Sequence, residues 1–160
     1  MPAPEGVFSG PQQFGQWVRE AIQTAALEAW PEMVWCDANF NDWPLREKAV
    51  VESLNAWSRA GRRLTLLALN YEGMRTLHPR FVTWRITWDH IIDARVCGGV
   101  DANDIPSALW GPGWALRRLD AERCTGVASA DARTRLLLRE AMDALYRKSR
   151  PGFPASTLGL

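Results

Sequence analysis

Lysine, histidine and cysteine are scarce in this chain, and long apolar runs are missing. The 19 basic residues include only two lysines, Lys48 and Lys148. The three cysteines, Cys36, Cys97 and Cys124, lie far apart without a C-x-x-C pair, which excludes a zinc knuckle or a disulfide framework. No apolar run approaches the ~20 residues of a membrane helix, and the first residues lack the basic and apolar regions of a secretory signal. We therefore expect a cytoplasmic protein with reduced thiols, no metal, no cofactor and no membrane contact.

The composition that remains is that of an ordinary globular protein. The chain has 160 residues, of which 47% are hydrophobic, enough for one domain with its own core. The formal net charge is only +1, so nucleic acid is expected to be an unlikely partner. The arginines are spread along the chain, which favours codon bias over a dedicated phosphate site, although each guanidinium fork suits carboxylate or phosphate.

Apolar periodicity divides the chain into alternating helices and strands. The predicted elements are a helix over 11–30, a strand at 33–36, a helix over 44–60, a strand at 64–69, a helix over 79–90, a strand at 92–97, a hairpin over 105–119, a strand at 125–128 and a helix over 130–149. This order predicts an α/β fold with a mixed, mostly parallel sheet and helices on both faces. We expect one domain overall, made of an N-terminal helix (1–30), an α/β part (31–150) and an extended C-terminal strap (151–160).

The hairpin is the most distinctive local feature. Gly111, Pro112 and Gly113 form a turn between two apolar runs, which Trp110 and Trp114 flank. One of these tryptophans could be exposed and stack on a base or a protein partner; a cross-strand aromatic pair is the alternative.

The element order, together with the closing pattern GVASADARTRLLLREAMDALYRKS, resembles one half of the phospholipase D-like superfamily, and within it small bacterial members with no assigned activity. The resemblance covers about residues 30–150. It implies a homodimer, because single halves of that superfamily pair, and a phosphodiesterase centre built on an H-x-K motif. Here the first hairpin strand has Ser107 and Leu109 in place of His and Lys, and the region around Gly126 reads TGVAS, without the expected Asn. No catalytic residue can be carried over, which predicts a non-catalytic domain.

A polar patch follows the first predicted strand. Asp37, Asn39 and Asn41 imitate the opening of a calcium loop, but Asp42 stands where that loop needs glycine and Lys48 where it needs a bidentate Glu. Turn formation and helix capping explain the patch more simply. Because ligands of α/β sheets bind at strand ends, Asp37, Asn39 and Asp42 remain the first place to look for a pocket.

His90 is the only histidine with carboxylates close by in sequence, Asp89 and Asp93. It could act as a general base, although its place at a predicted helix end is sufficient to explain it. An enzyme that uses Asp37, His90 and Ser107 is therefore one alternative function.

Three functions remain open on this sequence. The preferred one is a non-catalytic binding or assembly module, homodimeric, with a small-molecule or protein partner. The second is the hydrolase just described. The third is nucleic-acid binding, with phosphate contacts from Arg62, Arg63, Arg117 and Arg118 and stacking by Trp110 or Trp114.

Overall fold

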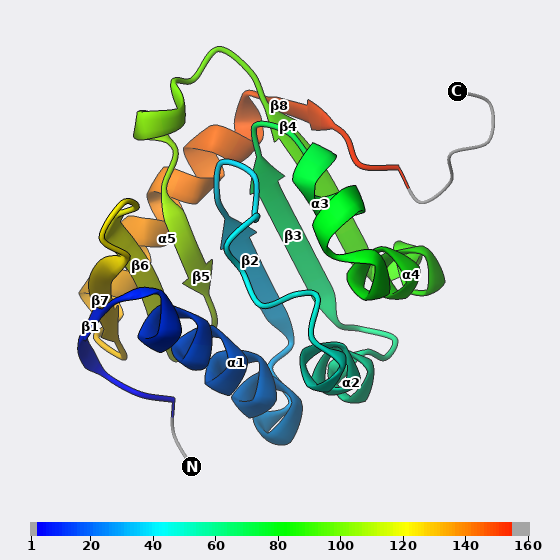
Figure 1. Ribbon diagram of the computed structural model, residues 1–160, viewed down its shortest axis with the longest axis horizontal. Helices are drawn as coiled ribbons and strands as arrows, with labels where there is room; N and C mark the ends of the chain where they lie inside the picture. Colours follow the sequence, from blue (N-terminus) through cyan, green and yellow to red (C-terminus); the bar gives the residue numbers. More distant parts are fainter. Residues whose placement is uncertain (1–2, 155–160) are drawn as a thin grey trace.

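An eight-stranded β-sheet forms the centre of the molecule, and helices lie on both of its faces (Figure 1). The computed structural model describes residues 3–154. The strands stand in the order β1-β7-β6-β5-β2-β3-β4-β8. In chain order they are β1 (Gly6–Ser9), β2 (Glu32–Cys36), β3 (Arg63–Ala68), β4 (Ile92–Cys97), β5 (Ser107–Trp110), β6 (Ala115–Asp120), β7 (Thr125–Ser129) and β8 (Ser149–Pro151).

The helices divide unequally between the two faces. They are α1 (Pro11–Glu28), α2 (Lys48–Trp57), α3 (Glu72–Leu77), α4 (Pro79–Thr87) and α5 (Ala132–Arg147), with short 3-10 turns at Asp89–Ile91 and Ala102–Asp104. Figure 1 shows α1 to α4 in front of the sheet and α5 alone behind it. Among the helices of residues 3–154, none has the length and apolar character to cross a bilayer.

The mixed α/β architecture is as predicted, but the expectation of a mostly parallel sheet is wrong. Within residues 3–154, only β2 with β3 and β3 with β4 pair in parallel, while the other five pairings are antiparallel. Parallel neighbours need long crossover connections, and only β2, β3 and β4 are joined by them. The short turns of β5-β6-β7 force antiparallel pairing. We call the end at which β2, β3 and β4 finish the carboxyl edge and the opposite end the amino edge.

Two apolar layers hold the sheet between the helices. The larger packs α1, α2 and α4 against the sheet and contains fully buried Trp35, Trp43 and Trp57. The smaller packs Leu138 and Met142 of α5 against the opposite face. Because a single helix cannot cover the whole face of an eight-stranded sheet, hollows remain beside α5.

Several sequence signals act as predicted. The first helix begins at Pro11 and buries Phe14, Val18 and Ile22 on one face. It ends at Ala29, which takes a left-handed conformation (φ 57°) just before Pro31. The hairpin closes where expected, with the Gly111 N–H donating to the Trp114 carbonyl at 2.8 Å. All three cysteines are free and buried.

Other boundaries differ from the sequence-based expectation. The second helix begins at Lys48 and not near residue 44, because residues 41–47 turn so that Trp43 and Leu45 enter the core. Two short edge strands, β1 and β8, were not predicted. Part of the expected strap is described: β8 pairs with β4 and Phe153 is buried, while 155–160 lie outside the described residues. The division of the chain at 30 and 150 stays a prediction.

Candidate functional site

The carboxyl edge is built around the carboxylate of Asp37, directly after β2. Its Oδ2 accepts the backbone N–H groups of Asn39 at 3.2 Å and of Phe40 at 2.8 Å. Phe40 has a positive φ of 60°, and this turn reverses the chain toward Asp42. The polar patch therefore forms an Asx turn, as the simpler interpretation of the sequence held. It does not cap the next helix as also expected, because α2 begins at Lys48 and the residue before it, Glu47, makes no side-chain cap hydrogen bond.

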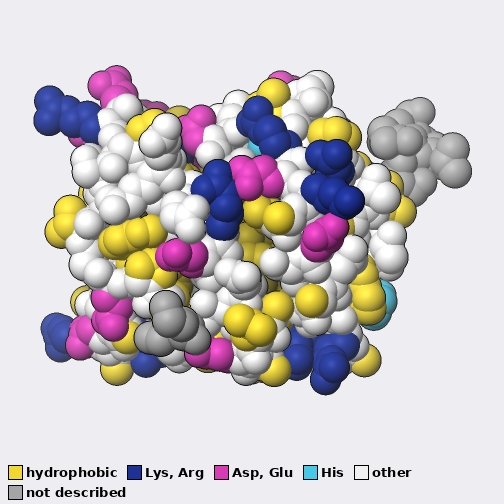
Figure 2. Space-filling model, turned by 60° about the horizontal axis from the view of Figure 1, so that its bottom comes forward, with side chains coloured by type: hydrophobic (Ala, Val, Ile, Leu, Met, Phe, Trp, Pro, Cys, Tyr) yellow, Lys and Arg dark blue, Asp and Glu magenta, His cyan; other side chains and the backbone are white. Residues whose placement is uncertain are grey.

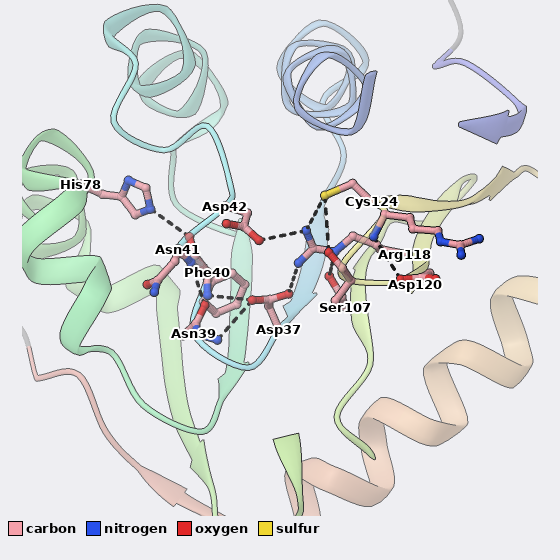
Figure 3. A network of polar contacts seen from close by, with 12 residues as sticks. Asp37, Asn39, Phe40, Asn41, Asp42, His78, Ser107, Arg118, Asp120 and Cys124 are labelled. Atoms are coloured by element: carbon pink, nitrogen blue, oxygen red, sulfur yellow. Dashed lines mark hydrogen bonds and ion pairs between the residues drawn. The ribbon is translucent and has the colours of Figure 1, made fainter. Parts of the chain in front are cut away.

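The guanidinium of Arg118, on β6, fills the space in front of Asp37 (Figure 3). Its Nη2 donates to Asp37 Oδ1 at 3.1 Å. Its Nε donates to the Ser107 hydroxyl at 3.1 Å, and its Nη1 contacts Asp42 Oδ2 at 3.2 Å and Cys124 Sγ at 3.5 Å. All three nitrogens of the guanidinium are thus occupied by groups of the protein. We call Asp37, Asp42, Ser107, Arg118 and Cys124 the arginine clasp.

The clasp is closed to solvent on the sheet side and toward α1. The Arg118 side chain is 4% exposed and that of Asp37 6%, and the guanidinium lies over the Phe14 ring, 4.4 Å from its centroid. Burial by itself lowers the pKa of Arg118, but the charge of Asp37 and the contacts with Cys124 and Asp42 outweigh it, so the pKa is raised. The clasp is therefore a charged, internally satisfied network. Four of the five N–H donors of Arg118 are taken by groups of the protein, so the guanidinium has little left to offer a phosphate.

The amino edge is arranged differently. Arg62, Arg63 and His90 line an open cavity of about 400 Å³ beside the start of β3 and β4, which we call the arginine cavity. The one acidic residue that lines it is Asp93, whose carboxylate also receives the Tyr146 hydroxyl and lies 3.9 Å from Arg95 Nη1. Arg63 Nη2 is 3.9 Å from the same carboxylate.

The arginine cavity therefore carries surplus positive charge. The Asp93 carboxylate is shared between Arg95 and Arg63, so it does not neutralise both, and Arg62 makes no ion pair within residues 3–154, its Nε donating to the Trp57 carbonyl at 3.1 Å. His90 is exposed at the same cavity, and its ring centroid lies 5.5 Å from that of Trp88.

A second cavity, of about 460 Å³, adjoins the first along Arg63 and lies between α5 and the start of β2 and β3; we call it the α5 cavity. Its floor is Val34, Thr65 and Leu67, and Met142 and Tyr146 of α5 form a wall. At its rim, Arg139 donates to both carboxylate oxygens of Glu32 at 3.2 Å and to Asp143 at 3.0 Å. The same guanidinium lies 4.5 Å from the centroid of the Trp110 ring.

The residues singled out from sequence thus separate into two groups. Asp37, Asn39, Asp42 and Ser107 converge at the carboxyl edge, but His90 lies at the opposite end of the strands. A catalytic set of Asp37, His90 and Ser107 is therefore not assembled. Within residues 3–154, no group of three His, Cys, Asp or Glu side chains is placed to hold a metal ion.

The remaining residues singled out from the sequence also lie apart from one another. Trp110 is half-buried and lies under Arg139, whereas Trp114 is buried beside Trp30 and donates to the Pro4 carbonyl at 2.8 Å. The two tryptophans therefore lie on opposite faces of the sheet and do not form a cross-strand pair. Arg117 is exposed, on the α5 face of β6.

Sequence reasoning missed the α5 cavity. Thr65 lies within an apolar strand and Arg139 and Tyr146 within an amphipathic helix, so none stands out as polar chemistry in the sequence. The helical spacing of Arg139 and Tyr146, two turns apart beside Met142, is the signal that places them on one side of α5.

Comparison with known proteins shows the fold. No protein-family model matches the sequence, and no curated protein does. Among solved structures, TrmBL2, described as an archaeal chromatin protein with a novel mode of DNA binding, is similar with a TM-score of 0.65 and 17% identity over 95% of this chain. That match covers 55% of TrmBL2, so the chain spans about half of that protein's length. NucT from Helicobacter pylori has a TM-score of 0.60 and 7% identity, over 93% of this chain and 99% of NucT.

These likenesses bear on two expectations. The likeness to NucT, a phospholipase D-family protein, agrees with the resemblance drawn from sequence at the level of the fold. The expectation that nucleic acid is an unlikely partner is wrong, because TrmBL2, a structural neighbour over 95% of this chain, is described as a DNA-binding chromatin protein. Net charge was a poor guide because it averages over the surface, whereas binding depends on where the charges lie.

Proposed function

We propose that this domain binds nucleic acid at its amino edge and that the arginine clasp has replaced a reaction centre at its carboxyl edge. The observation that carries the proposal is the arginine cavity, in which Arg62, Arg63 and His90 face one open hollow with a single, shared acidic neighbour. Guanidinium groups with free donors suit the phosphates of a nucleic-acid backbone. The DNA-binding description of TrmBL2 supports the same class of ligand.

The side of the molecule that carries α1 and α2 offers less for a polyanion. Figure 2 shows Lys and Arg side chains interspersed with Asp and Glu over the face that carries α1 and α2. Pairs such as Arg19 with Glu47, 2.7 Å apart, account for part of this pattern. The interspersed charges explain how a net charge of +1 is compatible with a local phosphate-binding surface.

The test is a salt titration of binding with a matched pair of variants. Short single-stranded and duplex DNA, fluorescently labelled, are titrated with the protein at several salt concentrations. The variant R62S/R63S removes the two arginines of the cavity, and R123S/R133S removes two exposed arginines elsewhere. We expect R62S/R63S to weaken binding and to lower the salt slope by roughly 1.4 for single strands, at about 0.7 for each phosphate contact.

The control R123S/R133S should leave affinity and slope nearly unchanged. Equal weakening in both variants would mean diffuse attraction and not a site at the amino edge. Absence of binding to either form of DNA at low salt would overturn the proposed function.

Two finer expectations stay predictions. The homodimer implied by the family resemblance is checked by light scattering at high protein concentration. The hydrolase alternative was expected to use Asp37, Ser107 and His90, but His90 lies at the opposite end of the strands, so only Asp37 and Ser107 could act together. That remainder is checked by assaying phosphodiester cleavage, with S107A as the variant that must lose activity.

A further inference from the structure

Thr65 places a hydroxyl group on the floor of the α5 cavity. It lies on β3, and the residue as a whole is 6% exposed. A hydroxyl group can both donate and accept a hydrogen bond, so in a cavity of about 460 Å³ it offers a contact to a hydrogen-bonding ligand.

The surroundings of Thr65 define the chemistry of that ligand. Val34 and Leu67 flank it on the floor, and Met142 and Tyr146 supply a wall with a sulfur atom and an aromatic ring. The charged groups Glu32, Arg139 and Asp143 stand at the rim. A ring with hydrogen-bonding groups on its edges suits such a lining, because Met142 and Tyr146 offer apolar contact while the hydroxyl and the rim groups offer hydrogen bonds.

The rim of the α5 cavity favours a ligand that carries hydrogen-bond donors. Glu32 and Asp143 present carboxylate oxygens there, each with capacity beyond the bonds they accept from Arg139. Carboxylates accept from the exocyclic amino groups of bases, as they do from cytosine N4. Thymine lacks such an amino group, so the rim discriminates against it.

The α5 cavity also lies where a strand bound at the arginine cavity would pass. Arg63 lines both cavities, so phosphates held by Arg62 and Arg63 bring the attached bases to the mouth of the α5 cavity. A base paired within a duplex cannot enter without leaving its partner, which costs unstacking and unpairing energy.

We infer that the α5 cavity takes one unpaired, amino-bearing base of a single strand whose backbone lies on the arginine cavity. This inference rests on the proposed function and adds to it the strandedness and base preference of the same site. Arg62 and Arg63 supply affinity; Thr65, Glu32 and Asp143 supply the preference.

The experiment compares oligo-dC, oligo-dA and oligo-dT in the same binding assay, with wild-type protein, T65V and T65L. T65V removes the hydroxyl with little change of shape, and T65L adds bulk to the cavity floor. V127L is the matched control, because Val127 lines a separate hollow on the other side of α5. Circular dichroism and a melting curve confirm that each variant is folded.

We expect oligo-dC and oligo-dA to bind the wild type about three- to tenfold more tightly than oligo-dT, a factor typical of one hydrogen bond. T65V should reduce this preference, T65L should abolish it, and V127L should retain it. If T65L fails to fold, T65V decides the question.

The possible failures are distinguishable. If oligo-dT binds as tightly as oligo-dC while R62S/R63S still weakens both, the α5 cavity holds no base but the proposed function stands. Free dCMP bound as tightly as oligo-dC would identify a nucleotide pocket and overturn the link to a strand. Without binding of any oligonucleotide, both proposals fail.

Discussion

At the scale of single residues, Arg118 decides what the carboxyl edge can do. Phosphoryl chemistry at the end of these strands would need cationic donors that are free to hold non-bridging oxygens. The donors of Arg118 are instead directed to Asp37, Asp42 and Ser107. The clasp therefore stabilises the fold, and its contribution can be measured as a change in the free energy of unfolding.

Removing one partner of this buried pair should be costly. We expect R118M to lower the free energy of unfolding by about 3 kcal/mol or more, because the Asp37 charge would remain buried without its cation. Urea unfolding measures the change. The adjacent exposed residue gives a matched control, since R117M should stay within about 0.5 kcal/mol of the wild type. Equal losses in the two variants would show that the clasp stabilises nothing.

At the scale of elements, the β5-β6 hairpin depends on a close approach at its turn. A Cβ atom on Gly111 would lie 2.5 Å from Cζ3 of Trp30, the residue that follows α1. No heavy atom lies within 4 Å of the corresponding position on Gly113, in the same turn. The hairpin turn thus packs against the end of α1 on one side only.

This contrast predicts opposite outcomes for two similar substitutions. We expect G111A to destabilise the fold by about 1–3 kcal/mol through overpacking, and G113A to be neutral within about 0.5 kcal/mol. The double variant W30F/G111A should recover part of the loss because the smaller ring makes room. Thermal unfolding of the three proteins checks this, and an equally harmful G113A would contradict the steric explanation.

The elements also show how far sequence reasoning reaches. Periodicity located α1, α5 and the hairpin, because each is long or has strong turn residues. It missed β1 and β8, since four and three residues carry too little pattern, and both exist by pairing with β7 and β4. Sheet direction was misjudged because pairing partners are set by tertiary contacts.

The sequence identified individual residues of the candidate site but did not predict how they are arranged in space. Asp37 and Arg118 were both noted, the first for a pocket and the second for a phosphate. Their mutual ion pair joins residues 81 positions apart through the neighbouring strands β2, β5 and β6, and no local pattern reports it. The grouping of Arg62 with His90 has the same origin, because β3 and β4 are parallel neighbours and begin at the same edge.

At the scale of the whole molecule, the ionisable groups act together on stability. His78 is fully buried; its Nε2 contacts the Phe40 carbonyl at 2.9 Å and its Nδ1 has no partner within residues 3–154. Burial lowers its pKa from the ordinary 6.5, helped by the nearby charge of Arg46. The pKa of Glu47 is lowered from 4.5 by its hydrogen bond with Arg19, and that of Asp131 from 3.8 by the backbone N–H of Thr134.

The pKa values of all three groups are lowered, so together they predict how the free energy of unfolding depends on pH. A group whose pKa is lower in the folded state binds protons more readily when unfolded, and the stability it contributes is lost as pH falls. The unfolding free energy should therefore begin to fall below pH 6.5, where unfolded His78 takes up a proton, and fall again below pH 4.5, where Glu47 does. Urea midpoints measured across this range test both steps. E47Q should flatten the fall of the unfolding free energy below pH 4.5 and leave the fall below pH 6.5 intact. If the unfolding free energy of the wild type stays level between pH 7 and about pH 5, the lowered pKa of His78 is contradicted.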